Sequence, residues 1–332
     1  SWFRKSADSG SADGQINLGH MYDSGWGVSQ SDAEALKWYL MAAVQGHAEG
    51  ALRAGNKYLL GRGVAQSYSE GLNWLQKSAA LGSTNAHYNI GVLYRDGTGV
   101  TRDYSEALKW FRLAAAKNYA SAQLNIGGMY YSGQGVAIDH AEGLRWVRLA
   151  SEQGLPEAQL SLSKMYYQGQ GANKDLGEAV KWVRKSAEQG FAEAQAVLGT
   201  LYYVGDGVPK DFLESSKWYR LAAAQGLASA KSELSPLQGR YQQELYKWYQ
   251  LAAAEGNVKA QKGLGRLYGS SVYEPNNDSR REYMWYKIAS LSGDLESSQL
   301  LPIISKRMTA EQLAEAEKLA TLCLQNLAKG CD

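Results

Sequence analysis

Histidine and cysteine are the side chains of this 332-residue chain best suited to bind metals or to act as bases and nucleophiles. No histidine pair has the spacing of a metal-binding helix, and neither cysteine has a histidine partner in a motif spacing. The chain also has no GxSxG motif and no P-loop. The residues concerned are His20, His47, His87, His140, Cys323 and Cys331. We therefore predict a protein that is not an enzyme and that binds no metal or cofactor.

Acidic or hydroxyl residues followed three positions later by glutamate recur at six places. Each pair is typical of a helix start, where the first side chain caps a free N–H and the glutamate reaches back to the N-cap residue. We interpret them as capping boxes and not as acid–base dyads. The pairs are Ser31/Glu34, Ser67/Glu70, Asp103/Glu106, Asp139/Glu142, Asp175/Glu178 and Asp211/Glu214.

Gly-x-Gly sequences recur just before these caps and could be mistaken for phosphate-binding loops. Their regular recurrence between helical segments favours turns, in which glycine adopts positive φ without strain. The pairs are Gly25/Gly27, Gly61/Gly63, Gly97/Gly99, Gly133/Gly135, Gly169/Gly171 and Gly205/Gly207. We predict no nucleotide site.

The elements that carry these patterns form a repeat of 36 residues. Tryptophans mark it at Trp2, Trp38, Trp74, Trp110, Trp146, Trp182 and Trp218, with Trp248 and Trp285 following at steps of 30 and 37. The clearest unit is Ala192–Leu227, which has helical apolar spacing on both sides of its glycine turn. A period of this length predicts stacked helix–turn–helix units with the tryptophans in the core. Gly199 and its counterparts Gly19, Gly55, Gly91 and Gly127 are predicted to let paired helices approach closely.

The period predicts one continuous stack. Residues 1–11 are expected to be the end of a truncated repeat, 12–227 six regular repeats, 228–257 a shortened repeat, 258–294 an irregular repeat and 295–332 C-terminal capping helices. Pro236 is expected to distort the helix that starts at Ala228 and to separate it from one over residues 242–254. Pro302 is expected to interrupt a further helix, and Thr309 with Gln312 opens a long final helix that ends at Gly330.

Charge and composition narrow the classes of partner. The 35 basic and 33 acidic residues give a net charge of +2, and no basic stripe favours nucleic acid. No apolar run is long enough to insert into a membrane. The first residues match the end of a repeat, so any export signal is expected upstream. Cys323 is expected either to form a disulfide with Cys331 or to lie in the core as a small apolar residue.

The repeat pattern A-x-A-Q-x-x-L-G-x-x-Y-x-x-G-x-G-V-x-x-D-x-x-x-A-x-x-W-x-x-x-A-A-x-x-G resembles the SEL-one-like (Sel1-like) repeat, a relative of the tetratricopeptide repeat, over nearly the whole chain. The resemblance implies an all-α, right-handed α/α superhelical solenoid of about nine 36-residue repeats. It also implies protein binding, a bacterial origin and the periplasm or cell envelope as location. A cysteine-rich branch of the family is linked to β-lactams, but this chain lacks that branch's cysteine pair in each repeat.

If the first helices line a concave groove, one position in each repeat faces a partner. That position is occupied by Asp23, Leu59, Arg95, Tyr131, Tyr167 and Tyr203. The three tyrosines would form an aromatic strip, since tyrosine buries area while keeping a polar tip. Neighbouring residues predicted on this face are His20, Tyr88, Asp96, Lys164 and Gln168. The alternative is that the tyrosines pack between helices and are structural.

These observations favour a non-enzymatic scaffold that binds a folded protein in its groove. Its role would be that of an envelope adaptor or an inhibitor, including an immunity protein against a secreted effector. The alternatives are a small-molecule or β-lactam-interacting protein, which needs a compact polar-lined pocket, and a peptide-binding module.

Overall fold

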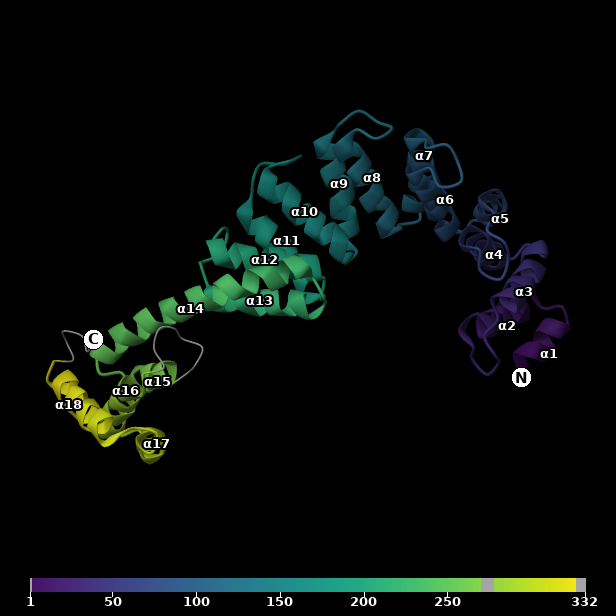
Figure 1. Ribbon diagram of the computed structural model, residues 1–332. Helices are drawn as coiled ribbons and strands as arrows, with labels where there is room; N and C mark the ends of the chain where they lie inside the picture. Colours follow the sequence, from purple (N-terminus) through teal and green to yellow (C-terminus); the bar gives the residue numbers. More distant parts are fainter. Residues whose placement is uncertain (1, 270–277, 327–332) are drawn as a thin grey trace. The chain divides into compact units, whose positions relative to one another are not determined.

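The computed structural model describes residues 2–269 and 278–326, and for residues 235–245, 248 and 326 the backbone alone. In this part of the chain all regular structure is helical, and Figure 1 shows the helices α1–α18. The contacts divide the chain into two compact units. Unit 1 is Ser1–Leu198 with Asp206–Val208, and unit 2 is Gly199–Gly205 with Pro209–Asp332. Each unit is described by itself.

Unit 1 is a row of helical hairpins that follows α1 (Trp2–Asp8). The first helices of the repeats are α2 (Ala12–Ser24), α4 (Ala48–Leu60), α6 (Thr84–Asp96), α8 (Ala120–Ser132), α10 (Pro156–Gln168) and the start of α12 (Ala192–Val204). The second helices are α3 (Asp32–Val44), α5 (Tyr68–Ala80), α7 (Tyr104–Ala115), α9 (His140–Glu152) and α11 (Leu176–Glu188). From α2 to α11 every helix packs on the next, so hairpins stack through alternating contacts. Within this row α2, α4 and α6 lie on the inner side (Figure 1).

The predicted turns are confirmed. Both glycines of every Gly-x-Gly pair have φ between 65° and 80°, the left-handed region that glycine adopts most readily. Asn118, which replaces the glycine at the end of a repeat, has φ 59°. The chain therefore reverses after each first helix at glycine and without backbone strain.

The second helices begin at the predicted N-cap residues, but the predicted return contact of the glutamate is not formed. In all six, the N-cap side chain accepts a hydrogen bond from the backbone N–H of the glutamate three residues on. The glutamate does not reach back, because the N–H of the N-cap residue instead donates to a tyrosine carbonyl in the preceding first helix, as from Asp211 to Tyr202 at 2.9 Å. Five of the six glutamates pair with a lysine or arginine three residues on, as Glu214 does with Lys217, whereas Glu70 has Asn73 at that position.

Small residues let the two helices of a hairpin approach closely, as predicted. A Cβ built at Gly91 would lie 2.7 Å from the Phe111 ring, and one at Gly19 would lie 2.6 Å from the Tyr39 ring. Ser163 takes the glycine position in α10, and its hydroxyl donates to the Ala179 carbonyl at 2.7 Å. These contacts fix the spacing of each hairpin.

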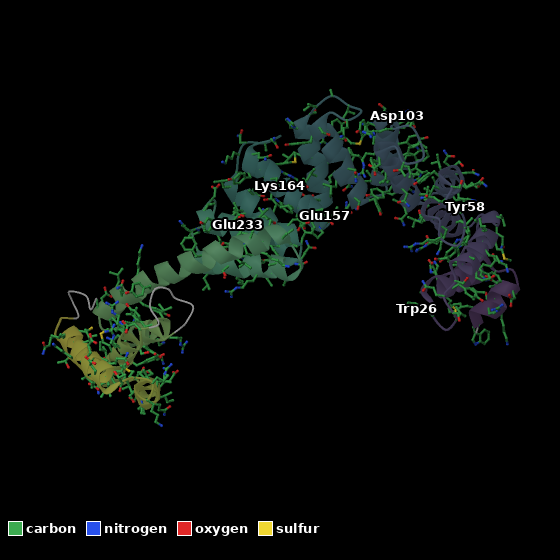
Figure 2. All side chains as sticks on the ribbon, viewed as in Figure 1. Trp26, Tyr58, Asp103, Glu157, Lys164 and Glu233 are labelled. Atoms are coloured by element: carbon green, nitrogen blue, oxygen red, sulfur yellow. The ribbon has the colours of Figure 1, made fainter. Side chains whose placement is uncertain are left out.

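Most repeat tryptophans are core residues. Trp38, Trp182 and Trp285 are buried, and Trp74, Trp110 and Trp146 are half-buried. The prediction is wrong for Trp2, which is 88% exposed because the described residues contain no first helix of its own repeat to cover it. The side chain of Trp248 lies outside the described part. Trp26, the tryptophan off the 36-residue spacing, is exposed in a turn (Figure 2).

Unit 2 begins with the end of α12 and continues with α13 (Phe212–Ala224), α14 (Ala228–Ala254), α15 (Val258–Tyr268), α16 (Ser279–Leu291), α17 (Leu295–Ser305) and α18 (Ala310–Asn326). Each of α13 to α16 packs on its neighbour in sequence, and both α17 and α18 pack on α16. In α13, Trp218 and Ala222 are buried, whereas Leu221 is 43% exposed.

Two predictions about proline are wrong. α14 continues through Pro236 as one helix, and α17 continues through Pro302. Proline removes one backbone hydrogen bond, but a chain reversal also needs residues that favour a turn. The shortened repeat has lost its Gly-x-Gly-Val sequence, so its two helical segments run on as one.

The C-terminal helix α18 begins with a complete capping box. Thr309 N–H donates to Gln312 Oε1 at 2.9 Å, and Gln312 N–H donates to Thr309 Oγ1 at 3.1 Å. Cys323 is buried with Trp285 and Ile288 in the unit 2 core. Cys331, its partner in the alternative of a disulfide, and the predicted helix end at Gly330 lie outside the described residues. Within the described ranges, no helix combines the length and apolarity needed to cross a membrane.

Candidate partner-binding face

Tyr131 and Tyr167 lie near the ends of α8 and α10 and are 36% and 38% exposed. Each hydroxyl reaches the middle residue of the next repeat's Gly-x-Gly turn. Tyr131 donates to Gln170 Oε1 at 2.7 Å, and Tyr167 donates to Asp206 Oδ2 at 2.7 Å. The two tyrosines therefore hold neighbouring repeats together through their hydroxyls while part of each ring stays exposed. On the first helices α6, α8 and α10, we call the exposed side chains on the same side as Tyr131 and Tyr167 the first-helix face.

Two further tyrosines predicted on this face have rings that pack against other aromatic rings. The Tyr203 ring is half-buried against Phe212, with ring centroids 5.6 Å apart, and belongs to unit 2. The Tyr88 ring packs between Phe111 and Tyr119 at centroid distances of 5.7 and 5.1 Å. Tyr88 is therefore mainly a packing residue, which agrees with the structural alternative at this position.

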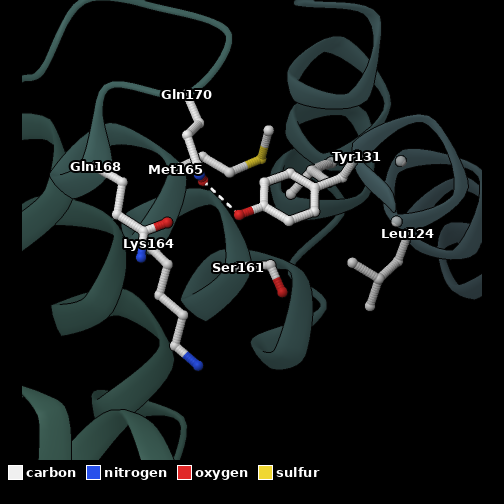
Figure 3. A pocket seen from close by; sticks show the side chains of 10 residues that line it. Leu124, Tyr131, Ser161, Lys164, Met165, Gln168 and Gln170 are labelled. Atoms are coloured by element: carbon white, nitrogen blue, oxygen red, sulfur yellow. Dashed lines mark hydrogen bonds between the residues drawn. The ribbon is translucent and has the colours of Figure 1, made fainter. Parts of the chain in front are cut away.

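A pocket of about 290 Å³ opens on the first-helix face between α8 and α10. Leu124 and Tyr131 from α8, and Lys164, Met165 and Gln168 from α10, contribute to its lining. Figure 3 shows Tyr131 and Leu124 on one side and Ser161, Met165 and Lys164 on the other. Three predicted site residues, Tyr131, Lys164 and Gln168, thus meet at one hollow.

Two adjacent glycines in α8 have different surroundings. A Cβ at Gly127 would lie 2.5 Å from Val147 Cγ2 and 3.0 Å from the Gly143 carbonyl oxygen, so packing on α9 requires glycine there. A Cβ at Gly128 would have no atom within 4 Å. Gly128 borders the pocket, so the missing side chain helps to keep the pocket open.

Charges near the N-terminal part of the first-helix face are paired within the chain. Arg95 Nε lies 2.7 Å from Asp96 Oδ1, and Arg95 also donates to Asn125 of α8. The hydrogen bond from Arg95 holds the pKa of Asp96 below its usual value and raises the pKa of Arg95. Arg95 therefore ties α6 to α8, and Asp96 remains exposed beside it.

Asp23 forms part of a buried ion pair. Lys57 of α4 is 5% exposed and contacts the carboxylates of both Asp23 and Asp32. The Tyr39 hydroxyl donates to Asp23 Oδ2 at 3.3 Å. The hydrogen bond from Lys57 lowers the pKa of Asp32. Asp23 and Lys57 thus hold the first two complete repeats together. The role of Asp23 is therefore structural rather than partner binding.

His20 packs edge-on against Tyr39, with ring centroids 5.6 Å apart. Burial lowers its pKa, so the ring is neutral at physiological pH. Leu59, at the tyrosine position of the second repeat, is half-buried and packs with Leu52 and Leu75. Among the described residues, no group of three or more His, Cys, Asp or Glu side chains is arranged to hold a metal ion.

A row of helical hairpins with capped second helices, glycine turns and buried tryptophans defines a helical repeat protein. The chain belongs to the Sel1 repeat family, a class of tetratricopeptide-like α solenoids. The family model Sel1 repeat matches residues 12–47, 48–83, 84–119, 120–155, 156–191, 192–227 and 246–257. These are seven matches, whereas the sequence pattern predicts about nine repeats. The right hand of the superhelix stays a prediction.

Two solved structures of the same class are similar to the chain. One is a protective antigen of uropathogenic Escherichia coli strains with an SLR fold, at 30% identity and a TM-score of 0.69, covering 98% of this chain and 72% of that chain. The other is a Sel1 repeat protein from Oxalobacter formigenes, at 32% identity and a TM-score of 0.60, covering 64% of this chain and 85% of that chain. No curated protein sequence matches significantly.

The sequence interpretation missed two features of this face. Gly128 was not singled out, although the Gly127-Gly128 pair is a visible departure from the other first helices. Gln170 was not linked to Tyr131, because the contact joins residues 39 apart in different repeats. A comparison of the same position in every repeat is the signal that finds both.

Proposed function

We propose that this Sel1 repeat protein is a non-enzymatic scaffold that binds a folded protein through its first-helix face, centred on α8 and α10. The observation that carries the proposal is the pair of partly exposed rings of Tyr131 and Tyr167 on neighbouring first helices. Tyrosine is enriched in protein interfaces because it buries a large area at little entropic cost.

The charge distribution supports the same region. α8 contains no charged residue, and α10 contains only Glu157 and Lys164 (Figure 2). The centres of interfaces are depleted in charge, since an unpaired charge is costly to remove from water. Arg53 of α4 and Arg95 of α6 are already paired, with Glu49 and Asp96. A partner that lies across α8 and α10 therefore desolvates few charges.

We further propose that the protein acts in the bacterial periplasm or cell envelope as an adaptor or an inhibitor, such as an immunity protein that neutralises a secreted effector. The similarity to a protective antigen of E. coli supports an envelope location. A folded partner is expected to bury about 1,600 Å² in total, counting both surfaces.

The test is affinity capture from the envelope fraction of the source cells, followed by mass spectrometry and affinity measurement with the captured protein. Tyr131→Ala combined with Tyr167→Ala should weaken binding at least about tenfold. The matched control is Leu113→Ala with Leu149→Ala, two side chains that are 49% and 45% exposed on the second helices α7 and α9. If the control weakens binding and the tyrosine variant does not, the partner binds the second helices and the proposal is wrong.

A further inference from the structure

The pocket beside Gly128 has a composition that neither the repeat pattern nor the fold requires. Its apolar wall consists of the side chains of Leu124, Val147 and Met165, of which Val147 and Met165 are 3% and 5% exposed overall. The ring of Tyr131 and the stem of Lys164 border it. With a volume of about 290 Å³, the pocket has room for one large apolar side chain.

Gly128 lowers the stability of its own helix without a packing reason. Glycine inside a helix costs roughly 0.5–1 kcal/mol relative to alanine, and a Cβ at this position would touch nothing. At the same place in neighbouring repeats the chain has Asn56, Val92 and Lys164. The side chain that would partly fill the pocket is therefore missing in α8 alone among these first helices.

Some polar groups of the pocket are bound within the chain, and others are open to a ligand. The Ser161 hydroxyl donates to the Glu157 carbonyl at 2.8 Å, and the Tyr131 hydroxyl donates to Gln170. Lys164 and Gln168 are exposed, and within the described residues neither has a hydrogen-bond or ion-pair partner. Lys164 is the single basic residue of α8 and α10, so the charge offered at the pocket rim is positive.

We propose that this pocket is the anchor site for the protein partner, and that it takes an aromatic or large aliphatic side chain whose neighbouring carboxylate pairs with Lys164. The apolar wall matches the side chain, and charge complementarity at the rim selects an acidic neighbour over a basic one. The inference rests on the proposed protein-binding function and specifies the chemistry of the partner's central contact. Anchors of this kind sit in desolvated pockets near the centre of an interface.

The test uses two small probes of matched shape, so it does not need the natural partner. The probes are 3-phenylpropanoate and 3-phenylpropylamine, which share a ring and chain and differ in the sign of their charge. Binding is followed by methyl NMR on the full chain, using the resonances of Leu124, Val147 and Met165. We expect the acid to shift these resonances and to bind about fivefold or more tightly than the amine.

Three variants make the result specific. Gly128→Leu fills the pocket and should abolish the shifts while leaving the thermal midpoint unchanged or higher. Ser132→Leu adds the same side chain one turn further along α8, outside the pocket lining, and should leave binding unchanged. Lys164→Glu should reverse the preference and favour the amine.

The proposal is overturned if neither probe shifts the pocket methyls, if the amine binds as well as the acid to the unmodified chain, or if Gly128→Leu still binds. Failure of the wider proposal looks different. In that case the probes bind as expected, but the captured partner is insensitive to both Gly128→Leu and the tyrosine variant. A partner that is sensitive to the tyrosines and insensitive to Gly128→Leu overturns the anchor alone.

Discussion

The hydroxyl of Tyr167 donates a hydrogen bond of 2.7 Å to the carboxylate of Asp206, which lies 39 residues further along the chain. Tyr131 makes the same contact with Gln170. The tyrosines proposed to meet a partner thus also support the turn of the next repeat. For this reason, replacing them removes both a contact surface and an inter-repeat hydrogen bond, and the two effects need separate variants.

The first prediction concerns the ionisation of Tyr167. The hydrogen bond to Asp206 raises the pKa of the phenol, because the neutral hydroxyl donates and the carboxylate repels a phenolate. Asp206→Asn should lower this pKa toward its ordinary value. Labelled-tyrosine NMR titration measures the shift. Because the folded pKa is the higher one, the stabilisation is fully present below about pH 10 and is lost as the pH rises through the folded pKa. An unchanged pKa in the variant would show that the contact is absent in solution.

The adjacent glycines of α8 lead to a second prediction, with opposite signs. Gly127→Ala should destabilise the protein, because its Cβ would lie 2.5 Å from Val147 Cγ2. Gly128→Ala should stabilise it by roughly 0.5–1 kcal/mol, since the helix gains propensity and the new methyl group meets nothing. Urea denaturation of the two variants gives the comparison. Equal changes in the free energy of unfolding would contradict the prediction that only Gly127 is required for packing on α9.

A third prediction concerns Lys57, which is buried between Asp23 and Asp32. Lys57→Met places there the residue found at Met129 and Met165, the same position of later repeats, and leaves two carboxylates without their cation. We expect a loss of about 1–3 kcal/mol at pH 7, below the value for a fully buried pair because the carboxylates are 30% and 37% exposed.

The matched control for Lys57 adds Asp23→Leu and Asp32→Tyr, the residues that occupy these positions as Leu59 and Tyr68 in the next repeat. This triple variant should recover most of the lost stability. The pH dependence gives a further check. The pKa of Asp32 is depressed, so its contribution is present above the unfolded pKa near 4 and is lost as the pH falls through the folded value. Lys57→Met should weaken this dependence.

The capping geometry supplies a fourth prediction. Asp211→Ala removes the acceptor for the N–H groups of Leu213 and Glu214 and should cost about 1 kcal/mol. Glu214→Ala removes only a pair with Lys217 and should cost about 0.2–0.5 kcal/mol. Thermal or chemical unfolding distinguishes the two. If both substitutions cost the same, the glutamate does reach back to the N-cap residue in solution.

Much of the fold could be predicted from the sequence because the same capping, turn and packing residues recur in successive repeats. The N-cap acceptors, the glycine turns and close-packing glycines such as Gly91 depend on nearby residues and match the prediction. The predicted return contact of the capping glutamates is wrong, because the N-cap N–H donates to the preceding helix instead. Helix breaks at Pro236 and Pro302 were wrongly expected, since a proline decides the end of a helix only when the following residues favour a turn.

The candidate site was less predictable. A fixed position in the repeat brought Tyr131 and Tyr167 to the surface but also selected Tyr203, which packs against Phe212. The hollow beside Gly128 depends on side chains from α8, α9 and α10 together, which no single repeat displays. The partner of Lys57 likewise comes from the preceding repeat.

The central claim is that a protein partner lies on the first-helix face of α8 and α10. Site-specific photo-crosslinking in the source cells tests it most directly, with a crosslinkable residue at Gln168 or, as the control, at the exposed Leu149 of α9. The account predicts a crosslinked partner from position 168, lost when Gly128→Leu is added, and none from position 149. Crosslinks to one protein from position 149 and none from position 168 would contradict it.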